Sequence, residues 1–403
     1  MRAVFHAVCG LLLTLLMSSA SAAISDGEIR IGLVTDMTSV YRDVGQGAEI
    51  AAEMAIEDFG GQINGKKIRL YVRDHKLDAD TAMIHAKELH EQERIDVFVE
   101  MVGTNVAIPL QRYAKEHNIL AIHTGTASSI LTGTECSPLG IHWAYDTYAL
   151  AGGTAAATIA QGADTWFFIT ADYVFGKVLQ AEATAVINRN GGQVLGTALH
   201  PLKATDFTAQ LAAAVQSGAK VIALANAGHD TIRAIQQAHE LGVGRSEAQM
   251  LVGLLVTEGT VRDLGHYVAQ GLKLTTAFFQ YYDEQTKAWG ARFRARSGDN
   301  ASMYTAGVYS ALMHYFKAIE ATGTDEPKTV IAKMRELPVN DFFARNGKLR
   351  ADGRMVHDMY LLEVKKPGEV ERVGDYFKVL KVIPGEQAFR PLEEGGCPYL
   401  AKR

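Results

Sequence analysis

Short apolar runs alternate along the chain with stretches in which apolar residues recur every three or four positions. The first pattern is typical of buried strands and the second of amphipathic helices. In the first part of the chain the apolar runs predict strands over 29–34, 68–72, 97–99 and 119–122. The helical periodicity predicts helices over 48–59, over 80–93 and from a loop at 103–105 to about 117. Loops are expected over 38–45 and 123–129. Strand–helix–strand order predicts a parallel sheet with right-handed crossovers.

A second series of the same kind begins near residue 166. Strands are predicted over 166–169, 193–198, 221–224 and 250–253, with helices ending at 190, 217 and 242 and loops over 170–176 and 225–229. The pattern then predicts a short helix over 260–270 and an extended segment over 272–279. Helices within 286–321 and 328–337 and strands over 359–364 and 376–382 are expected after them. We therefore expect two α/β lobes, connected by chain crossings near 141–145, 272–279 and 341–352.

The first 22 residues have the pattern of a cleavable signal peptide. Arg2 gives a positive start, residues 10–17 form an apolar centre, and Ala20-Ser21-Ala22 is a small-residue cleavage site. The apolar run is too short to span a bilayer of about 30 Å as a helix. The sequence thus predicts an exported chain located in the periplasm.

Composition narrows the class of protein further. The chain has 403 residues, of which 48% are hydrophobic and 21% charged, so it can bury the cores of two domains. Its formal net charge is −5 and no basic stripe is present, which argues against nucleic acid and against an anionic membrane surface as partners.

The cysteines are few. Cys9 lies in the signal peptide, so the mature chain keeps Cys136 and Cys397. Two cysteines in an oxidising compartment are expected to pair, and we predict a disulfide between them. The alternative is two unpaired thiols.

Motifs for catalysis or metal binding are missing from the sequence. It contains no glycine-rich phosphate loop, no Gly-x-Ser-x-Gly nucleophile elbow and no zinc-protease motif. His85 and His90 are not spaced as a metal pair on one helix face. We expect no catalytic residue, no cofactor and no metal, and therefore a binding protein rather than an enzyme.

Four motifs in order resemble one family. Gly32 to Asp36, Gly47 to Glu49, Ala55 to Asp58 and Ala171 to Gly176 resemble the substrate-binding proteins of branched-chain amino-acid ABC transporters, over residues 25–400. The resemblance implies the type I periplasmic-binding-protein fold, with two Rossmann-like lobes joined by three crossovers. It places 23–143 and 277–345 in lobe I, and 144–276 and 346–403 in lobe II.

Within that family the chain resembles a subgroup that serves uptake of aromatic acids. The segments that carry this resemblance are 36–38, 57–61, 142–150 and 357–360. It implies a monomeric receptor that binds a small carboxylate between the lobes, closes on it and docks on a membrane permease. Alternatives are a receptor for branched-chain amino acids or amides, a ligand-sensing partner of a signalling system and, less favoured, an exported enzyme.

Loops after two neighbouring strands carry the candidate carboxylate site. In the family the matching loops hold the ligand carboxylate with hydroxyls and backbone amides, which implies that role for Thr104, Asn105, Thr126, Ala127 and Ser128. The alternative from the residues alone is ordinary helix capping by Thr, Asn and Ser.

Aromatic residues match the rest of the family's cleft. These are Tyr41, Tyr173, Phe175 and Tyr304, whose alternative role is packing in the core or hinge. Leu255 stands where amino-acid-binding members place a carboxylate for the ligand's ammonium group. This departure predicts a ligand without an α-amino group, unless Glu258, three residues later, restores the charge.

Overall fold

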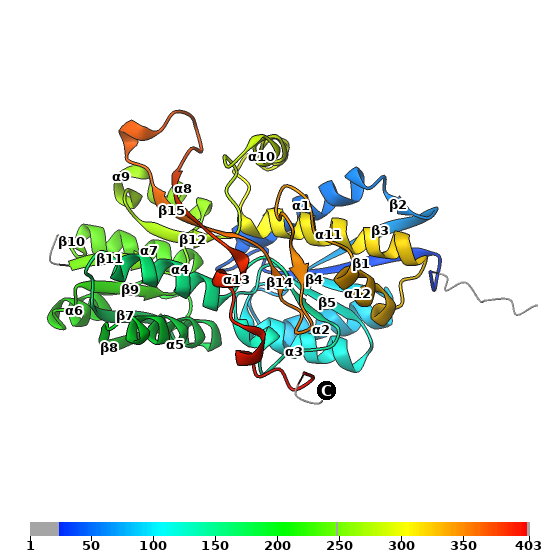
Figure 1. Ribbon diagram of the computed structural model, residues 1–403, viewed down its shortest axis with the longest axis horizontal. Helices are drawn as coiled ribbons and strands as arrows, with labels where there is room; N and C mark the ends of the chain where they lie inside the picture. Colours follow the sequence, from blue (N-terminus) through cyan, green and yellow to red (C-terminus); the bar gives the residue numbers. More distant parts are fainter. Residues whose placement is uncertain (1–23, 247–248, 401–403) are drawn as a thin grey trace, which may run out of the picture.

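The computed structural model describes residues 24–246 and 249–400. The predicted signal peptide and Cys9 lie outside the described residues. Figure 1 shows two α/β lobes side by side, with the blue, cyan and yellow parts of the chain in one and the green part in the other. The type I fold expected from the resemblance is confirmed.

Lobe I is built on a six-stranded sheet in the order β2-β3-β1-β4-β5-β6. All neighbours are parallel except β2 and β3. The Ile, Leu and Val side chains of its strands are fully buried, as at Ile31, Leu33 and Val99. Strands of a parallel sheet are covered on both faces, which explains why short apolar runs in the sequence predicted them. The bounds are β1 (Glu28–Thr35), β2 (Gln62–Ile63), β3 (Lys66–Asp74), β4 (Val97–Glu100), β5 (Leu120–His123) and β6 (Gly140–His142).

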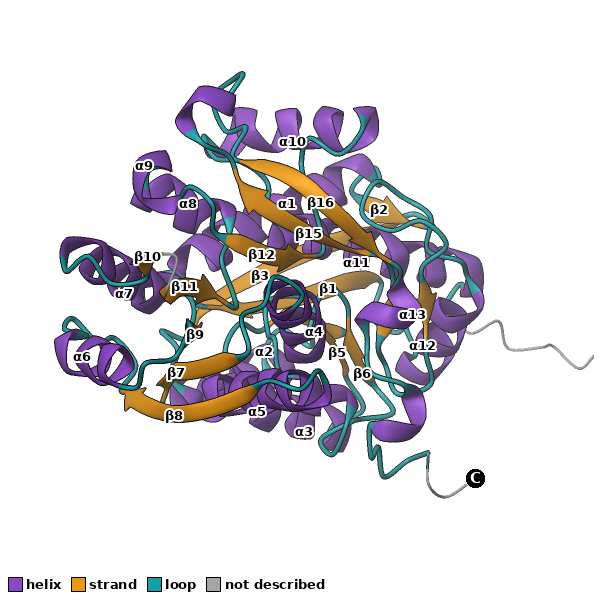
Figure 2. Ribbon diagram, turned by 60° about the vertical axis from the view of Figure 1, so that its left-hand side comes forward, coloured by secondary structure: helices purple, strands orange, loops and turns teal. Residues whose placement is uncertain are grey.

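Helices from two distant parts of the chain cover this sheet. The helices that follow its strands are α1 (Arg42–Asp58), α2 (Ala79–Glu91) and α3 (Thr104–Glu116), and those from later in the chain are α10 (Glu284–Ser297), α11 (Met303–Thr322) and α12 (Pro327–Glu336). The helix α11 packs along α1, and this contact brings the late segment into lobe I (Figure 2).

Lobe II repeats the arrangement on a five-stranded sheet in the order β10-β11-β9-β7-β8. Its strands are β7 (Thr165–Ala171), β8 (Gln193–His200), β9 (Val221–Ala225), β10 (Arg245–Ser246) and β11 (Gln249–Gly253). Its helices are α4 (Thr147–Ile159), α5 (Val174–Arg189), α6 (Thr208–Gln216), α7 (Gly228–Glu240), α8 (Glu258–Leu264) and α9 (His266–Ala269). From β7 onward the strands and helices follow the predicted order, with the short strand β10 added.

Two smaller sheets lie where the chain passes between the lobes. The strands β12 (Lys273–Thr276), β15 (Met359–Val364) and β16 (Phe377–Ile383) form an antiparallel sheet, and β13 (Lys348–Leu349) pairs with β14 (Met355–Val356). The short helices are α13 (Gly385–Ala388), η1 (Ser129–Thr132), η2 (Pro367–Glu369) and η3 (Leu392–Glu394).

The sequence pattern did not reveal α4, and the predicted first helix began too late. The sequence of α4 is Thr-Tyr-Ala-Leu-Ala-Gly-Gly-Thr-Ala-Ala-Ala-Thr-Ile. The helix packs between α5 and β12 and therefore needs no polar face. Without a polar face it shows no helical periodicity in the sequence. The helix α1 begins at Arg42 rather than 48, so Gly45, where we expected the preceding loop to end, lies inside the helix. A Cβ on Gly45 would lie 2.3 Å from the Asp36 carbonyl oxygen, so close packing requires glycine there.

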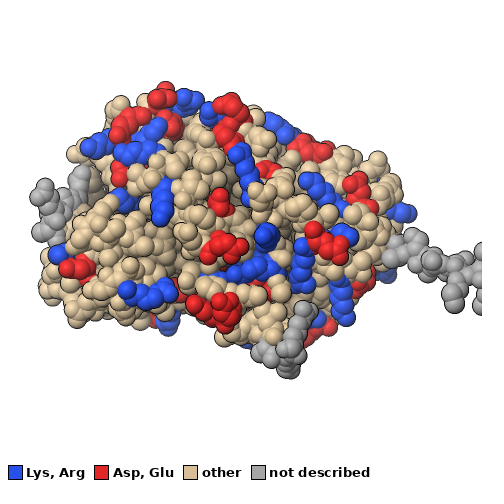
Figure 3. Space-filling view, viewed as in Figure 1, with Lys and Arg blue, Asp and Glu red and all other residues tan. Residues whose placement is uncertain are grey.

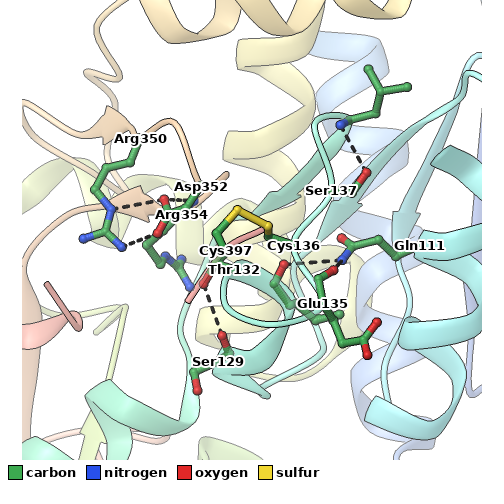
Figure 4. The surroundings of a disulfide bond; sticks show 12 residues. Gln111, Ser129, Thr132, Glu135, Cys136, Ser137, Arg350, Asp352, Arg354 and Cys397 are labelled. Atoms are coloured by element: carbon green, nitrogen blue, oxygen red, sulfur yellow. Dashed lines mark hydrogen bonds and ion pairs between the residues drawn. A yellow bond between two sulfur atoms is a disulfide. The ribbon is translucent and has the colours of Figure 1, made fainter. Parts of the chain in front are cut away.

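The C-terminal segment returns to lobe I. Cys136 and Cys397 are joined by a disulfide with a Cα–Cα distance of 5.5 Å (Figure 4). Arg390 donates to the Ser129 carbonyl oxygen, and the His142 amide donates to that of Gly353 at 2.8 Å. Parts of 346–403 thus contact lobe I, although we assigned this segment to lobe II. The lobe boundaries as a whole stay a prediction.

Acidic and basic side chains are interspersed over the surface seen in Figure 3, without a large patch of one sign. Across the described residues, every helix is too short or too polar to cross a membrane.

Candidate ligand-binding cleft

A cavity lies between the two lobes, with an empty volume of about 600 Å³ that includes space open to solvent. Its walls are mostly apolar and aromatic side chains together with a few hydroxyls and glycines, as is typical of small-molecule sites. Seven of the ten predicted site residues line it: Tyr41, Thr104, Ala127, Tyr173, Phe175, Leu255 and Tyr304.

On the lobe I side, the N-terminus of α3 faces the cavity. Gly103 precedes the helix with φ = 94°, and among the described residues no side chain caps the helix. Among the described residues, none hydrogen-bonds the hydroxyl of Thr104, although that residue is 1% exposed. An uncapped helix N-terminus with a buried, unpartnered hydroxyl can accept an anion. This geometry offers the predicted carboxylate site free donors.

The loop after β5 forms the neighbouring wall through Gly125 and Ala127. Ser128 is fully buried behind them, and its hydroxyl contacts no hydrogen-bond partner within the described chain. Thr126 and Asn105 make contacts within the protein instead. The Thr126 hydroxyl donates to the Met101 carbonyl oxygen, and the Asn105 amide donates to that of Leu77 at 2.9 Å. Thr126, Ser128 and Asn105 do not line the cavity itself.

Aromatic side chains from both lobes close the cavity. The hydroxyls of Tyr41 in lobe I and Tyr173 in lobe II hydrogen-bond each other at 2.6 Å. Tyr173 and Phe175 have ring centroids 5.8 Å apart, and Tyr304 lies edge to face with Tyr145 at 5.4 Å. Burial raises the pKa of both Tyr41 and Tyr173, so these are neutral phenols at physiological pH. The walls are therefore flat, uncharged and able to hydrogen-bond.

Leu255 lines the cavity and is 3% exposed, as its predicted role requires. Glu258, the residue that could have replaced the missing carboxylate, lines an adjoining cavity with Arg262 and Thr305 rather than the cleft. Burial raises the pKa of Glu258 to about 8. A neutral acid outside the cleft is a poor partner for a ligand's ammonium group.

Several cleft residues were not predicted from the sequence. The N-terminal part of α7 contributes Gly228, His229 and Ile232, and the segment before α8 contributes Thr257. We had placed a loop over 225–229, directly after a buried strand and before a helix, and that position alone could have marked it as part of the site. Tyr145 was assigned only to a chain crossing.

The lobes are in contact across the cleft. Arg262 of α8 forms ion pairs with Asp43 of α1 at 3.0 Å and with Asp299, just before α11, at 2.7 Å. The Ser129 hydroxyl of lobe I donates to Glu182 of α5. A Cβ on Gly228 would lie 2.8 Å from the Val40 carbonyl oxygen, so the lobes approach closely there. The structure is thus a closed arrangement.

Charge is scarce in the cleft. Of the described residues that line it, none is lysine or arginine, and the single acidic residue, Asp43, is paired with Arg262 at 3.0 Å. Within the described part of the chain, no three His, Cys, Asp or Glu side chains gather in a way that could hold a metal ion. A ligand in this cleft would be held by hydroxyls, backbone amides and apolar walls.

Comparison with known proteins identifies the family. A family model described as "Periplasmic binding protein" matches residues 28–369. The chain belongs to this family. A periplasmic binding protein from Burkholderia mallei is 40% identical with a TM-score of 0.90, and covers 93% of this chain and 99% of its own. No protein among the curated sequences matches the chain.

Further solved structures share the architecture. A branched-chain amino acid ABC transporter periplasmic ligand-binding protein from Burkholderia xenovorans is 33% identical over 92% of this chain and 99% of its own, with a TM-score of 0.83. An ABC transporter solute-binding protein from R. palustris, solved with benzoate, is 19% identical over 92% of this chain and 100% of its own, with a TM-score of 0.81. That last likeness shows the fold alone.

Members of this family are periplasmic proteins that bind solutes for ABC transporters and are not enzymes. The chain is a solute-binding receptor of this kind, as the resemblance implied. The ten site residues stay a prediction.

Proposed function

We propose that this periplasmic binding protein receives a small carboxylic acid with an aromatic or apolar body for an ABC importer. The observation that carries the proposal is the pairing of free donors with walls that are mostly apolar or aromatic and have no unpaired acidic residue among the described residues. Thr104 and the uncapped α3 N-terminus offer donors for a carboxylate, while Leu255 stands where an amino acid would need an acidic partner.

Known relatives support the chemistry. Solute-binding proteins of the same fold from Rhodopseudomonas have been solved with benzoate, 3,4-dihydroxybenzoic acid and 4-hydroxybenzoate. The flat tyrosine walls of this cleft suit such rings, and the neutral hydroxyls of Tyr41 and Tyr173 can bond ring substituents.

Closure and export complete the proposal. The ligand would bridge the lobes and stabilise the closed arrangement, which the permease then recognises. The signal peptide predicted over residues 1–22 would deliver the chain to the periplasm. Uptake and sensing are separated by a gene deletion: loss of import of the labelled acid supports uptake, whereas retained import with loss of a transcriptional response supports sensing.

The direct test is a thermal-shift screen followed by calorimetry with benzoate, 4-hydroxybenzoate and leucine. Leucine would bury an ammonium group without a charged partner, at a cost of about 1.5–3 kcal/mol, so the acids should bind roughly tenfold or more tightly. The ligand should be recovered unchanged by mass spectrometry. Tight leucine binding without any response to the aromatic acids would reject the ligand class and leave the receptor function standing.

Two substitutions sharpen the test. Thr104→Val removes a free donor and should weaken benzoate binding, whereas Leu255→Glu places a carboxylate in the apolar wall and should weaken it more. Thr158→Val is the matched control, because Thr158 is equally buried but its hydroxyl donates to Thr154 within α4. If Thr158→Val changes benzoate affinity as much as Thr104→Val does, the carboxylate site is misplaced.

A further inference from the structure

Directly behind the carboxylate site lies a buried acid, Glu100, the last residue of β4. Its side chain is fully buried. One carboxyl oxygen, Oε2, accepts a hydrogen bond from the Val102 amide at 3.1 Å. The Thr35 hydroxyl lies beside the carboxyl group and favours its ionised form, and neither this hydroxyl nor Oε1 has another hydrogen-bond partner among the described residues. A Cβ added to Gly125 would lie 1.8 Å from Oε1, so the carboxyl packs directly against the loop that follows β5.

The backbone around Glu100 is held in an unusual conformation. Glu100 has φ = 82° and Met101 has φ = 56°, values in a region that residues other than glycine rarely adopt. Such strain persists only where the surroundings enforce it, and it clusters at functional sites. Here the Thr126 hydroxyl bonds the Met101 carbonyl oxygen. Both loops of the carboxylate site are thus built around one acid side chain.

Within the described part of the chain, no cation compensates this acid. Its neighbours from the packed elements are Asp36 after β1, His123 opposite it on β5, Tyr145 and, on α11, Tyr304. Asp36 accepts backbone hydrogen bonds from Thr38, Ser39 and Tyr41.

The other three neighbours are uncharged. Burial lowers the pKa of His123 to about 3 and raises the pKa of both tyrosines. None of the described lysines or arginines pairs with Glu100. A buried carboxylate without a cation is costly, and burial raises the pKa of Glu100 to about 8.

We propose that Glu100 is a positioning residue kept as a neutral carboxylic acid beneath the carboxylate site, and that binding of an acid there is linked to its protonation. The inference rests on the proposed function. A neutral Glu100 shapes the loops carrying Val102 and Gly125 without opposing an anion. An ionised Glu100 would repel the ligand carboxylate across a water-poor interior, so the acid binds only to the protonated form.

The first test measures benzoate affinity by calorimetry from about pH 6 to 9.5, a range in which benzoate itself stays ionised. The dissociation constant of the natural protein should be constant below about pH 7.5 and rise above pH 8, by up to tenfold per pH unit. Near pH 8.5, binding should take up a proton, seen by comparing buffers of different ionisation enthalpy. Glu100→Gln, an isostere of the neutral acid, should bind benzoate at every pH without this dependence.

Glu258→Gln is the matched control. Glu258 is also buried, and its pKa is also raised to about 8, but it lies in lobe II and does not line the cleft. This variant should keep the pH dependence of the natural protein. The proposal is overturned if Glu258→Gln removes the dependence, if Glu100→Gln retains it, or if Glu100→Gln folds but no longer binds benzoate at neutral pH.

A second test needs no ligand and therefore separates this proposal from the proposed function. Between the unfolded pKa of about 4.5 and the folded pKa of about 8, the folded chain keeps a proton that the unfolded chain loses, so the stability of the natural protein falls as pH rises. Glu100→Gln has no carboxyl proton to lose, so its stability should not fall for this reason. Its unfolding midpoint in urea should match that of the natural protein near pH 4.5 and exceed it progressively up to pH 8. A constant difference across this range would show that Glu100 is not held neutral.

Discussion

Arg262 bridges the lobes, and its removal should weaken ligand binding without harming either lobe. The guanidinium comes from α8 of lobe II and contacts two carboxylates of lobe I, Asp43 at 3.0 Å and Asp299 at 2.7 Å. Burial disfavours the charged form of Arg262, but hydrogen bonds and charges from Asp263 and Asp299 hold its pKa above its usual value. Opening the cleft would separate Arg262 from Asp43 and Asp299 but not from Asp263, its neighbour on α8. Arg262→Gln therefore removes an electrostatic attraction between the lobes that exists only in the closed arrangement.

The size of the effect follows from exposure. The Arg262 side chain is 34% exposed, and those of Asp43 and Asp299 are 41% and 51% exposed. Solvent screens such pairs, and each contributes about 0.2–1 kcal/mol. Two pairs give about 0.4–2 kcal/mol, which corresponds to a loss of roughly 2- to 30-fold in ligand affinity. The natural protein should also lose affinity in about 1 M salt, where the Debye length is about 3 Å, and Arg262→Gln should lose less.

Calorimetry with benzoate at low and high salt measures this, together with small-angle scattering to follow closure. Arg292→Gln is the matched control, because Arg292 on α10 pairs with Asp58 on α1 at 2.6 Å within lobe I. The control should keep full affinity. Equal losses in the two variants, or an unchanged affinity of Arg262→Gln at low salt, would refute the view that Arg262 stabilises closure.

Three further results are expected. Gly228→Ala should weaken ligand binding more than Gly265→Ala, since both glycines have positive φ but only Gly228 packs against the opposite lobe; calorimetry compares them. Arg354→Met should lower the free energy of unfolding by about 3–5 kcal/mol in urea, because Asp146 would lose its buried ion partner. Thiol titration of the denatured, unreduced mature protein should find no free thiol at Cys136 or Cys397, and reduction should cost about 2–5 kcal/mol of stability; two free thiols would reject the bridge.

Local patterns in the sequence were enough to predict the alternating strands and helices, because buried parallel strands and amphipathic helices each leave their own period. The helix α4 was missed because it is apolar on all sides. Within the site, loops after strands could be located from the chain alone, and Leu255 and Thr104 do line the cleft.

What the sequence could not provide was contact between distant segments. The hydrogen bond between Tyr41 and Tyr173 joins residues 132 positions apart and depends on how the lobes meet. Glu100 is a single acid at the end of an apolar run, and nothing local distinguishes it from an exposed residue. Its burial follows from Gly125 packing against it, a contact that only the folded chain creates.

The contacts between the lobes differ in strength between the hinge and the rim, and this difference suits a receptor that must open again. At the hinge, the fully buried Arg354 donates to the carbonyl oxygens of Trp143 and Tyr145 and lies 4.4 Å from the centroid of the Phe389 ring. Burial lowers the pKa of Arg354 to about 10, so it remains charged at neutral pH. At the rim, half-exposed ion pairs such as that of Arg262 contribute about 1 kcal/mol or less each. The hinge thus keeps the crossings together, while the weak rim leaves the balance between open and closed forms to the ligand.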